Sequence, residues 1–394
     1  MNYILFDDHS WDQLLPLTFT RPVSELRVGI LKIREKWEKL LNAETSVLTR
    51  EYLQQKFPVH YQKDNILINS SLLPTYSLIN KIKEIHEGQA ILHRDRILAI
   101  RLPKSEALDF NYSSGLIRDK ILISEELRFI DRPWHIIMLN GDEINSDFEL
   151  ITKNRKSAGP GNTINVLSPG NIFVEEGFKA EFVTINATTG PIYLGKNSEI
   201  MEGSVIRGPF ALCENSTIKL AAKIYGSTTI GHNSTVGGEV KNSVIQGFSN
   251  KSHDGFLGNS VLGEWCNIGA DSNNSNLKNN YADVKLWSYP EGKFISTGLQ
   301  FCGLIMGDHS KCGINTMFNT GTVVGVNANI FGSGFPRNFV PSFSWGGPQN
   351  FTVFSISKAF EVAEKVMSRK NIPLDEKDRA ILLHVFNLTE KYRE

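Results

Sequence analysis

Aliphatic residues recur at every sixth position through much of the second half of the chain. The first run is Leu194, Ile200, Ile206, Leu212, Ile218, Ile224, Ile230 and Val236, and the second is Met306, Cys312, Phe318, Val324 and Ile330. A period of six fits neither a helix nor a pleated strand and is typical of β-solenoids. We predict triangular coils in which each unit forms one flat face and a Gly, Asn or Ser corner around an aliphatic ladder. A β-sandwich with chance spacing is the alternative.

The first 150 residues have a different texture, in which short apolar runs alternate with amphipathic segments. Helices are predicted at residues 28–41 and 77–86, where apolar positions follow the helical period. Strands are predicted at residues 3–6, 46–49, 65–68, 90–93 and 135–139. This alternation favours a Rossmann-like α/β domain with a largely parallel sheet.

A polar, Gly- and Pro-rich stretch at residues 152–163 is the predicted domain boundary. We therefore expect an α/β domain at 1–150, a linker at 151–165, a β-helix at 166–350 and helices at 351–394. The tail contains two amphipathic segments, which we expect to cover the open end of the solenoid, where strand groups would otherwise be unpaired.

Composition narrows the range of functions. Lys+Arg and Asp+Glu both number 42, so a nucleic-acid-binding or polybasic membrane surface is not expected. No apolar run approaches the roughly 18 residues of a membrane span. The start, "MNYILFDDHSW", carries Asp7 and Asp8 and no Lys or Arg, and does not read as a secretion signal, so a cytoplasmic protein is expected. We expect the four cysteines to be buried free thiols, with a zinc site as the alternative.

His253 is a lone imidazole in a stretch rich in Asn, Ser and Gly. The six-residue register breaks after Val236 and resumes at Leu257, which places His253 near a corner or loop. An unprotonated imidazole there can take a proton from an amine or hydroxyl that attacks a carbonyl. Gly255 would leave backbone amides open to a developing oxyanion. A surface histidine without a chemical role is the alternative.

The solenoid resembles the left-handed parallel β-helix of hexapeptide-repeat acyltransferases. "EVKNS" at 239–243 and "SNKSHDGFLGNSVLGEWCNIGAD" at 249–271 resemble, with matching gaps, the acetyltransferase half of the bifunctional N-acetylglucosamine-1-phosphate uridyltransferase/glucosamine-1-phosphate acetyltransferase family. The resemblance implies that His253 is the general base. The substrate-binding residues that it implies are Lys241, Lys223, Asn267 and Asn276, with Tyr281 as a loose substitute. It also implies acetyl-CoA as co-substrate and a homotrimer with sites between subunits.

The N-terminal half resembles sugar-phosphate nucleotidyltransferases at "LLPLTFTRPVSELRVGILKIREKW" (14–37) and "RPWHIIMLNGDEINSDF" (132–148). Three features depart from that family. "DDHSWDQ" stands in place of a Gly-rich phosphate turn, Val23 replaces a lysine, and uncharged residues 69–71 replace the metal-binding aspartate. Mg²⁺ would be required if the domain were active. Arg21, Glu25 and Arg27 would serve a revised nucleotide site, or form a solvated helix start.

These patterns predict a transferase that moves an acetyl or acyl group from CoA to an amino-sugar phosphate or sugar nucleotide. Two alternatives remain open. One is a sugar-1-phosphate nucleotidyltransferase whose β-helix only oligomerises, and the other is a non-catalytic sugar-nucleotide-binding protein.

Overall fold

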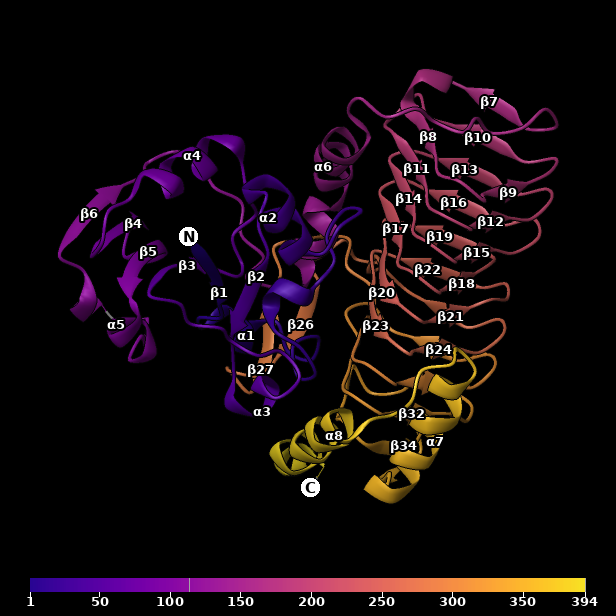
Figure 1. Cartoon of the computed structure of the whole chain (residues 1–394). Coiled ribbons are helices and arrows are strands. Elements are labelled where there is room, and N and C mark those ends of the chain that lie inside the picture. Colours follow the sequence, from indigo (N-terminus) through magenta and orange to yellow (C-terminus); the bar gives the residue numbers. More distant parts are fainter. Residues whose placement is uncertain (113, 394) are drawn as a thin grey trace. The chain divides into compact units, whose positions relative to one another are not determined.

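The computed structural model describes residues 1–112 and 114–393, and the chain divides into two compact units (Figure 1). The first unit comprises Met1–Leu14, Thr20–Leu26 and Leu31–Arg132. The second comprises Leu15–Phe19, Arg27–Ile30 and Pro133–Glu394. No described helix is long and apolar enough to cross a membrane.

A six-stranded sheet forms the centre of the first unit, in the order β2-β1-β3-β5-β4-β6. Its strands are β1 (Asn2–Phe6), β2 (Thr45–Leu48), β3 (Asp64–Asn69), β4 (Gln89–His93), β5 (Arg96–Pro103) and β6 (Asp119–Leu122). Strands β2, β1 and β3 are parallel, as are β4 and β6, whereas β5 runs antiparallel to both of its neighbours. The predicted α/β class is confirmed, and so are the four predicted strands within this unit.

Short helices complete the first unit. They are α1 (Ser10–Gln13), α2 (Ile33–Leu41), α3 (Glu51–Gln54), α4 (Tyr76–Glu84) and α5 (Lys104–Leu108), with 3-10 turns at Val23–Glu25 and Ser114–Leu116. Both predicted helices are present as α2 and α4. Trp37 of α2 is fully buried and its Nε1 donates to the carbonyl of Leu72 at 3.0 Å, which fixes this helix to the chain that follows β3.

Helix α6 (Pro133–Thr152) corrects one prediction, because residues 135–139 are helical and do not form a strand. Its buried positions, Ile136, Ile137, Asn140 and Ile144, follow the helical period, which a five-residue apolar window cannot reveal. The helix packs against strands of the β-helix, so the second unit begins at Pro133, before the predicted boundary near residue 150.

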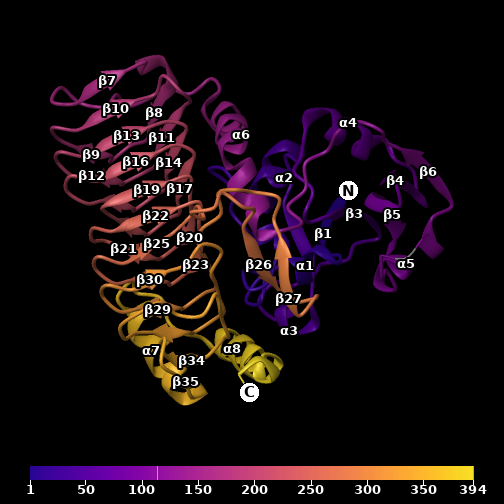
Figure 2. The same ribbon diagram turned by 180° about the vertical axis from the view of Figure 1, so that it is seen from behind.

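The second unit is a parallel β-helix with three faces (Figures 1 and 2). The first face has β7 (Asn165–Leu167), β10 (Thr184–Asn186), β13 (Val205–Arg207), β16 (Lys223–Tyr225), β19 (Glu239–Lys241) and β22 (Phe256–Gly258). The second has β8 (Ile172–Val174), β11 (Ile192–Leu194), β14 (Phe210–Leu212), β17 (Thr228–Ile230), β20 (Val244–Gly247), β23 (Val261–Glu264), β28 (Ile305–Met306), β31 (Val323–Val324) and β33 (Phe339–Val340).

The third face has β9 (Lys179–Ala180), β12 (Glu199–Ile200), β15 (Thr217–Ile218), β18 (Thr235–Val236), β21 (Asn250–Lys251), β24 (Asn267–Ile268), β29 (Lys311–Cys312), β32 (Asn329–Ile330), β34 (Ser344–Gly346) and the antiparallel β35 (Phe351–Val353). Strands β25 (Asn273–Asn274) and β30 (Met317–Phe318) form a separate parallel pair, and β25 lies in contact with β22, the last strand of the first face. A 3-10 turn, Pro169–Asn171, precedes β8.

Every member of the two predicted six-residue runs is buried in one continuous core of the β-helix, which confirms the ladder. Several corners are turned by asparagine with positive φ, for example Asn197, Asn215 and Asn233. Asparagine adopts this left-handed conformation more readily than most residues, which explains the polar letter that recurs beside each ladder position.

The apparent break after Val236 is a shortening of corners and not an excursion from the coil. The ladder continues through Val240 and Ile245, in steps of four and five residues, and reaches Lys251 on the third face. Lys251 is the Cα partner of Val236, so a lysine takes the inward position that an aliphatic residue takes elsewhere. This substitution is what conceals the register in the sequence.

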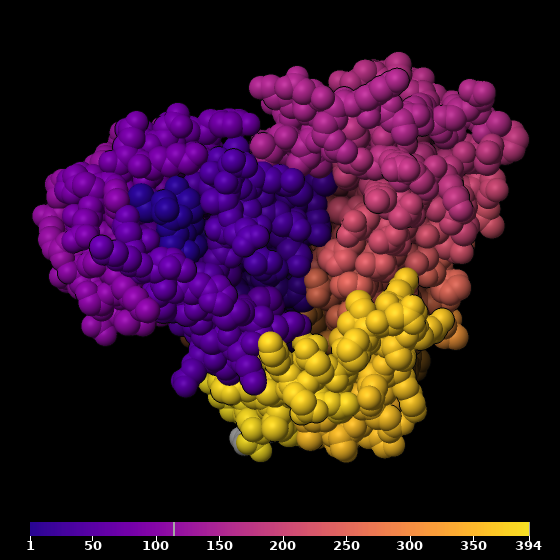
Figure 3. All heavy atoms as spheres, viewed as in Figure 1, coloured from indigo at the N-terminus to yellow at the C-terminus, as the bar shows by residue number. Residues whose placement is uncertain are grey.

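The C-terminal segment closes the last coil, as predicted. Helices α7 (Ile356–Ser368) and α8 (Glu376–Leu388), followed by a 3-10 turn at Glu390–Tyr392, cover this end of the β-helix, where the yellow residues lie over the orange ones (Figure 3). Phe386 of α8 meets Phe343 edge to face at 5.1 Å between ring centroids. The segment near residue 290 forms a hairpin, β26 (Lys285–Ser288) and β27 (Lys293–Ser296), whose Trp287 stacks on Phe339.

Candidate functional site

His253 lies on the corner between β21 on the third face and β22 on the first face, and its side chain is exposed. Its imidazole makes no hydrogen bond or ion pair with any residue in the described part of the chain. Gly255 lies two residues after His253 and has a φ of +114°, and a Cβ there would collide with the carbonyl of Ser272 on the next coil. The turn can therefore pass close to the coil below only because it contains glycine.

Lys223 and Lys241 are exposed on the first face, which begins immediately after the His253 corner. On successive strands of this face, Lys223, Glu239 and Phe256 are partners in one row. Tyr225, Lys241 and Gly258 are partners in a second row. Neither ammonium forms an ion pair within residues 1–112 and 114–393. The structure thus brings these two lysines to the face at whose edge His253 lies.

The two asparagines predicted to bind substrate, Asn267 and Asn276, lie in different places. The Nδ2 of Asn276 donates to Oδ1 of Asn259 at 2.8 Å, and the backbone N–H of Asn259 donates to the carbonyl of Lys241, so Asn276 lies beside the row of Lys241. Asn267 is exposed on β24 of the third face, between Asn250 and Lys311. Asn267 therefore does not share the face of the two lysines.

Tyr281 is exposed in the loop before β26, where its carbonyl accepts a hydrogen bond from Nε2 of Gln300 at 3.2 Å. No contact in the described residues joins its phenol to His253. A substrate role for Tyr281 stays a prediction.

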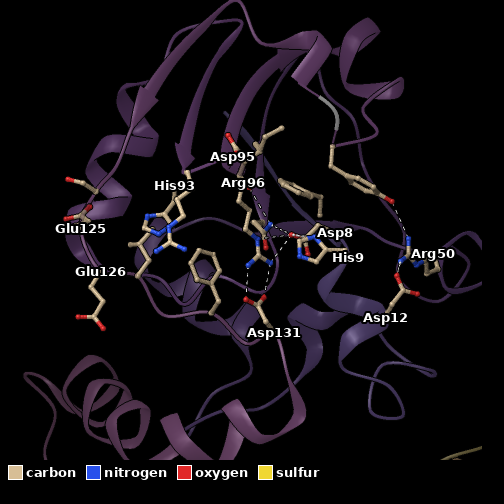
Figure 4. A pocket seen from close by; sticks show the side chains of 18 residues that line it. Asp8, His9, Asp12, Arg50, His93, Asp95, Arg96, Glu125, Glu126 and Asp131 are labelled. Atoms are coloured by element: carbon tan, nitrogen blue, oxygen red, sulfur yellow. Dashed lines mark hydrogen bonds and ion pairs between the residues drawn. The ribbon is translucent and has the colours of Figure 1, made fainter. Parts of the chain in front are cut away.

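A second site was not predicted from the sequence. A cavity of about 1100 Å³ opens in the first unit at the edge where β1, β3, β4 and β6 end and β5 begins (Figure 4). Six acidic residues and three arginines from chain segments far apart in sequence line it: Asp8, Asp12, Asp95, Glu125, Glu126, Asp131, Arg50, Arg94 and Arg96. Ligands bind commonly at this edge of open α/β sheets.

Arg96 organises this cavity. Its guanidinium contacts Asp8 at 2.8 Å and Asp131 at 2.9 Å, donates to Oγ of Ser71 at 2.7 Å, and lies 4.4 Å from the ring of Phe129 (Figure 4). Burial opposes ionisation of Asp8, but Arg96, Ser10 and Asn69 together hold the pKa of Asp8 below its usual value.

Asp7, the residue before Asp8, is buried and does not line the cavity. Its carboxylate accepts hydrogen bonds from the backbone N–H of Val23 at 3.1 Å and from Oγ1 of Thr49 at 2.6 Å. Burial outweighs these bonds and raises the pKa of Asp7 to about 7.

Asn69 is one of the uncharged residues that stand where sugar-phosphate nucleotidyltransferases have a metal-binding aspartate. Its side chain forms hydrogen bonds with neighbouring residues. Its Nδ2 donates to Asp8 at 2.8 Å, and its Oδ1 accepts from the N–H and Oγ of Ser71. Because Arg96 already pairs with both Asp8 and Asp131, these residues do not fit a resident Mg²⁺. Among the described residues no group of three or more His, Cys, Asp or Glu side chains could hold a metal ion.

The three residues of the revised nucleotide site lie outside the cavity lining. Glu25 is buried and pairs with Lys32 at 3.0 Å and Arg34 at 2.7 Å. Arg21 is also buried. Arg27 belongs to the second unit, where its backbone N–H donates to Oε1 of Gln246 at 2.6 Å. A nucleotide role for Arg21, Glu25 and Arg27 stays a prediction.

The four cysteines, Cys213, Cys266, Cys302 and Cys312, are free and buried, as predicted. Burial raises the pKa of both Cys266 and Cys302 to about 12, so these thiols are poor nucleophiles. The alternative of a zinc site finds no support in these positions.

Comparison with known proteins gives the two halves a context. Residues 3–156 match the family model described as sugar nucleotidyl transferase. The N-terminal part of the chain is therefore similar to that family. A bifunctional sugar-1-phosphate nucleotidylyltransferase/acetyltransferase of Sulfurisphaera tokodaii is 37% identical over 93 residues, which are 24% of this chain and 23% of that protein.

Two further relatives cover more of the chain. The bifunctional protein GlmU of Methanococcus vannielii is 27% identical over 211 residues, covering 51% of this chain and 42% of that protein. An uncharacterized acetyltransferase of Escherichia coli, YaiX, is 34% identical over 153 residues, covering 38% of this chain and 66% of that protein. The matched segments thus span 23% of the S. tokodaii protein and less than two thirds of each of the other two relatives.

Among solved structures, a hexapeptide transferase family protein from Anaplasma phagocytophilum is 14% identical, with a TM-score of 0.18, and the match covers 58% of this chain and 92% of that one. The β-helix assignment rests on the three sheets described above and not on this likeness.

Proposed function

We propose that this chain is a sugar-phosphate transferase that moves an acyl group from an acyl-CoA to an amino-sugar phosphate or a sugar nucleotide. One observation carries the proposal. The exposed imidazole of His253, which has no partner among the described residues, borders a face with two exposed ammonium groups, those of Lys223 and Lys241, which form no ion pair with any described residue. The names of the bifunctional relatives and of the E. coli acetyltransferase support the same chemistry.

The proposed roles follow from the side chains. Lys223 and Lys241 would bind the phosphate of the acceptor as point charges. The imidazole of His253 would take the proton of the acceptor amine as its nitrogen attacks the thioester carbonyl. The N–C bond forms, the C–S bond breaks, and the imidazolium returns its proton to the CoA sulfur. The N–H of Gly255, which donates to no acceptor in the described residues, would stabilise the oxyanion.

The experiment measures release of free CoA from purified protein, acetyl-CoA and a panel of amino-sugar phosphates and sugar nucleotides. His253→Ala should lower this release by about 10²-fold or more. His60→Ala, which removes another exposed imidazole from the first unit, should match the unaltered protein. Equal rates for His253→Ala and the unaltered protein would remove His253 from the mechanism.

A second function is favoured by the cavity in the first unit. We propose that it binds a sugar nucleotide without nucleotidyl transfer, because Arg96 already neutralises the carboxylates that a metal would require. Calorimetry with UDP- and dTDP-sugars should show binding that is unchanged by EDTA. Mg²⁺-dependent pyrophosphate release from a nucleoside triphosphate and a sugar-1-phosphate would contradict this proposal.

The resemblance to hexapeptide-repeat enzymes also supports a homotrimer, in which a neighbouring β-helix would complete the acyl-CoA groove. Light scattering coupled to size exclusion should give three times the mass of the chain. A monomer that retains full turnover would refute a site shared between subunits.

A further inference from the structure

Lys251 is a lysine within an aliphatic ladder. Its column on the third face otherwise contains residues such as Ile200, Ile218, Val236 and Ile268, and Lys251 is the direct Cα partner of Val236. Its relative exposure is 1%, so its side chain is as well buried as these neighbours. A buried ammonium requires hydrogen-bond acceptors, because an unpaired charge in such surroundings is strongly unfavourable.

The ammonium finds its acceptors at the corner that carries His253. The Nζ of Lys251 donates to the carbonyl of Gly237 at 3.0 Å and to the carbonyl of His253 at 2.6 Å. Gly237 lies at the same corner one coil earlier, so a single amine joins two successive corners. In the described part of the chain no other donor reaches either carbonyl.

Neighbouring coils show why a donor is needed there. Two coils away from His253, Oγ of Ser204 donates at 2.9 Å to the carbonyl of Lys219, the position equivalent to Gly237. In the next coil the position of Ser204 is taken by Ala222, which has no hydroxyl. The amine of Lys251 therefore replaces the missing serine at Gly237, and it has a second bond available for His253.

We propose that Lys251 is a positioning residue whose buried ammonium holds the carbonyl of His253 and thereby fixes the imidazole at the edge of the first face. The inference rests on the proposed acyl transfer. Without this bond, the hydrogen bonds that the turn of residues 252–255 keeps with other described residues are those of Asp254 and Gly255, whose carbonyls accept from Asp271 and Glu239. The peptide that carries the imidazole would then be free to rotate.

The test separates the anchoring of His253 from support of the coil. Lys251→Met removes both bonds with little change in length, whereas the double variant Ala222→Ser/Lys251→Met supplies a new hydroxyl donor to Gly237 alone. Lys251→Met should lower kcat about 10-fold with KM for acyl-CoA within twofold, and should raise amide hydrogen exchange at residues 253–255. The double variant should restore thermal stability toward that of the unaltered protein and leave kcat low.

Ile218→Val, in the same column, is the control for a loosened ladder and should keep kcat within twofold. Should Lys251→Met fail to fold, Lys251→Gln, a shorter and uncharged donor, is measured by the same criteria. Equal kcat and equal exchange in Lys251→Met and the unaltered protein would overturn the role of Lys251 and leave the proposed function standing. An unaltered protein that releases no CoA with any acceptor would overturn the proposed function, and the positioning role with it.

Discussion

Replacing Lys251 by methionine should change how the stability of the β-helix depends on pH. Burial lowers the pKa of Lys251 from 10.5 to about 8, although Asp254, Cys312 and Asp271 act in the opposite direction. Between these two pKa values the unfolded chain binds more protons than the folded one, so stability rises with pH. Below pH 8 both states carry the charge, and its burial costs a constant amount of about 3 kcal/mol.

The magnitude can be followed from neutral pH upward. As the folded state loses its proton first, this cost should fall by about 1.4 kcal/mol between pH 7 and pH 9, and by about 2.5 kcal/mol at pH 10. Lys251→Met lacks the titrating group. The unfolding free energy of the unaltered protein should therefore rise by these amounts relative to that of the variant.

Urea unfolding of the β-helix, followed by circular dichroism at pH 7, 9 and 10, measures the difference. Comparison with the variant cancels the titration of all other groups, including Lys311, whose pKa burial also lowers to about 8. Ile218→Val should differ from the unaltered protein by the same amount at each pH. A difference between Lys251→Met and the unaltered protein that is constant within about 0.5 kcal/mol would show that the amine titrates normally and would refute the reasoning.

Three further changes probe the two units. Arg96→Ala should lower the unfolding free energy of the first unit by about 3 kcal/mol, because the buried Asp8 loses its ion pair. Thermal denaturation should show this loss, and it should show none for Arg94→Ala, which changes an exposed arginine. In the unaltered protein the folded state holds the proton of Asp7 between about pH 4 and 7, so stability should decrease as the pH rises through this range. Asp7→Asn should remove this decrease, as urea titration at several pH values would show. Ile218→Ala should cost about 2–5 kcal/mol in urea unfolding of the β-helix, and a cost below about 1 kcal/mol would contradict a packed ladder.

The fold could be predicted where one residue type repeats at a fixed interval. The period of six identified the coils from Leu194 to Val236 because each inward position needs an aliphatic side chain regardless of its neighbours. Residues 135–139 were misassigned since five apolar residues fit a strand and a buried helix equally well. The apolar Ile144, seven residues after Ile137, continues the helical spacing beyond this window and would have pointed to a helix.

The sites were predictable to different degrees. His253 and the two lysines of the first face were predicted from the resemblance to a known family, and their roles stay predictions. The structure brings the two lysines to one face because neighbouring coils place residues about one coil apart in sequence side by side. The cavity of the first unit could not be found in this way, since Asp8, Arg96 and Asp131 come from distant segments. The signals available were the acidic pair that ends the first strand and the charged turn "HRDR" at 93–96.

The two sites also differ in how their charges are compensated, and this difference bears on where chemistry takes place. In the cavity, Arg96 and Arg50 are already paired with carboxylates, so an anionic ligand that approaches these two arginines must compete with bonds that the protein has made. On the first face, Lys223 and Lys241 are exposed and form no ion pair with any described residue. Exposed ammonium groups attract phosphate over roughly 10 Å at moderate ionic strength. The KM for a phosphorylated acceptor should accordingly rise with salt, whereas binding of a ligand in the cavity should depend on salt much less.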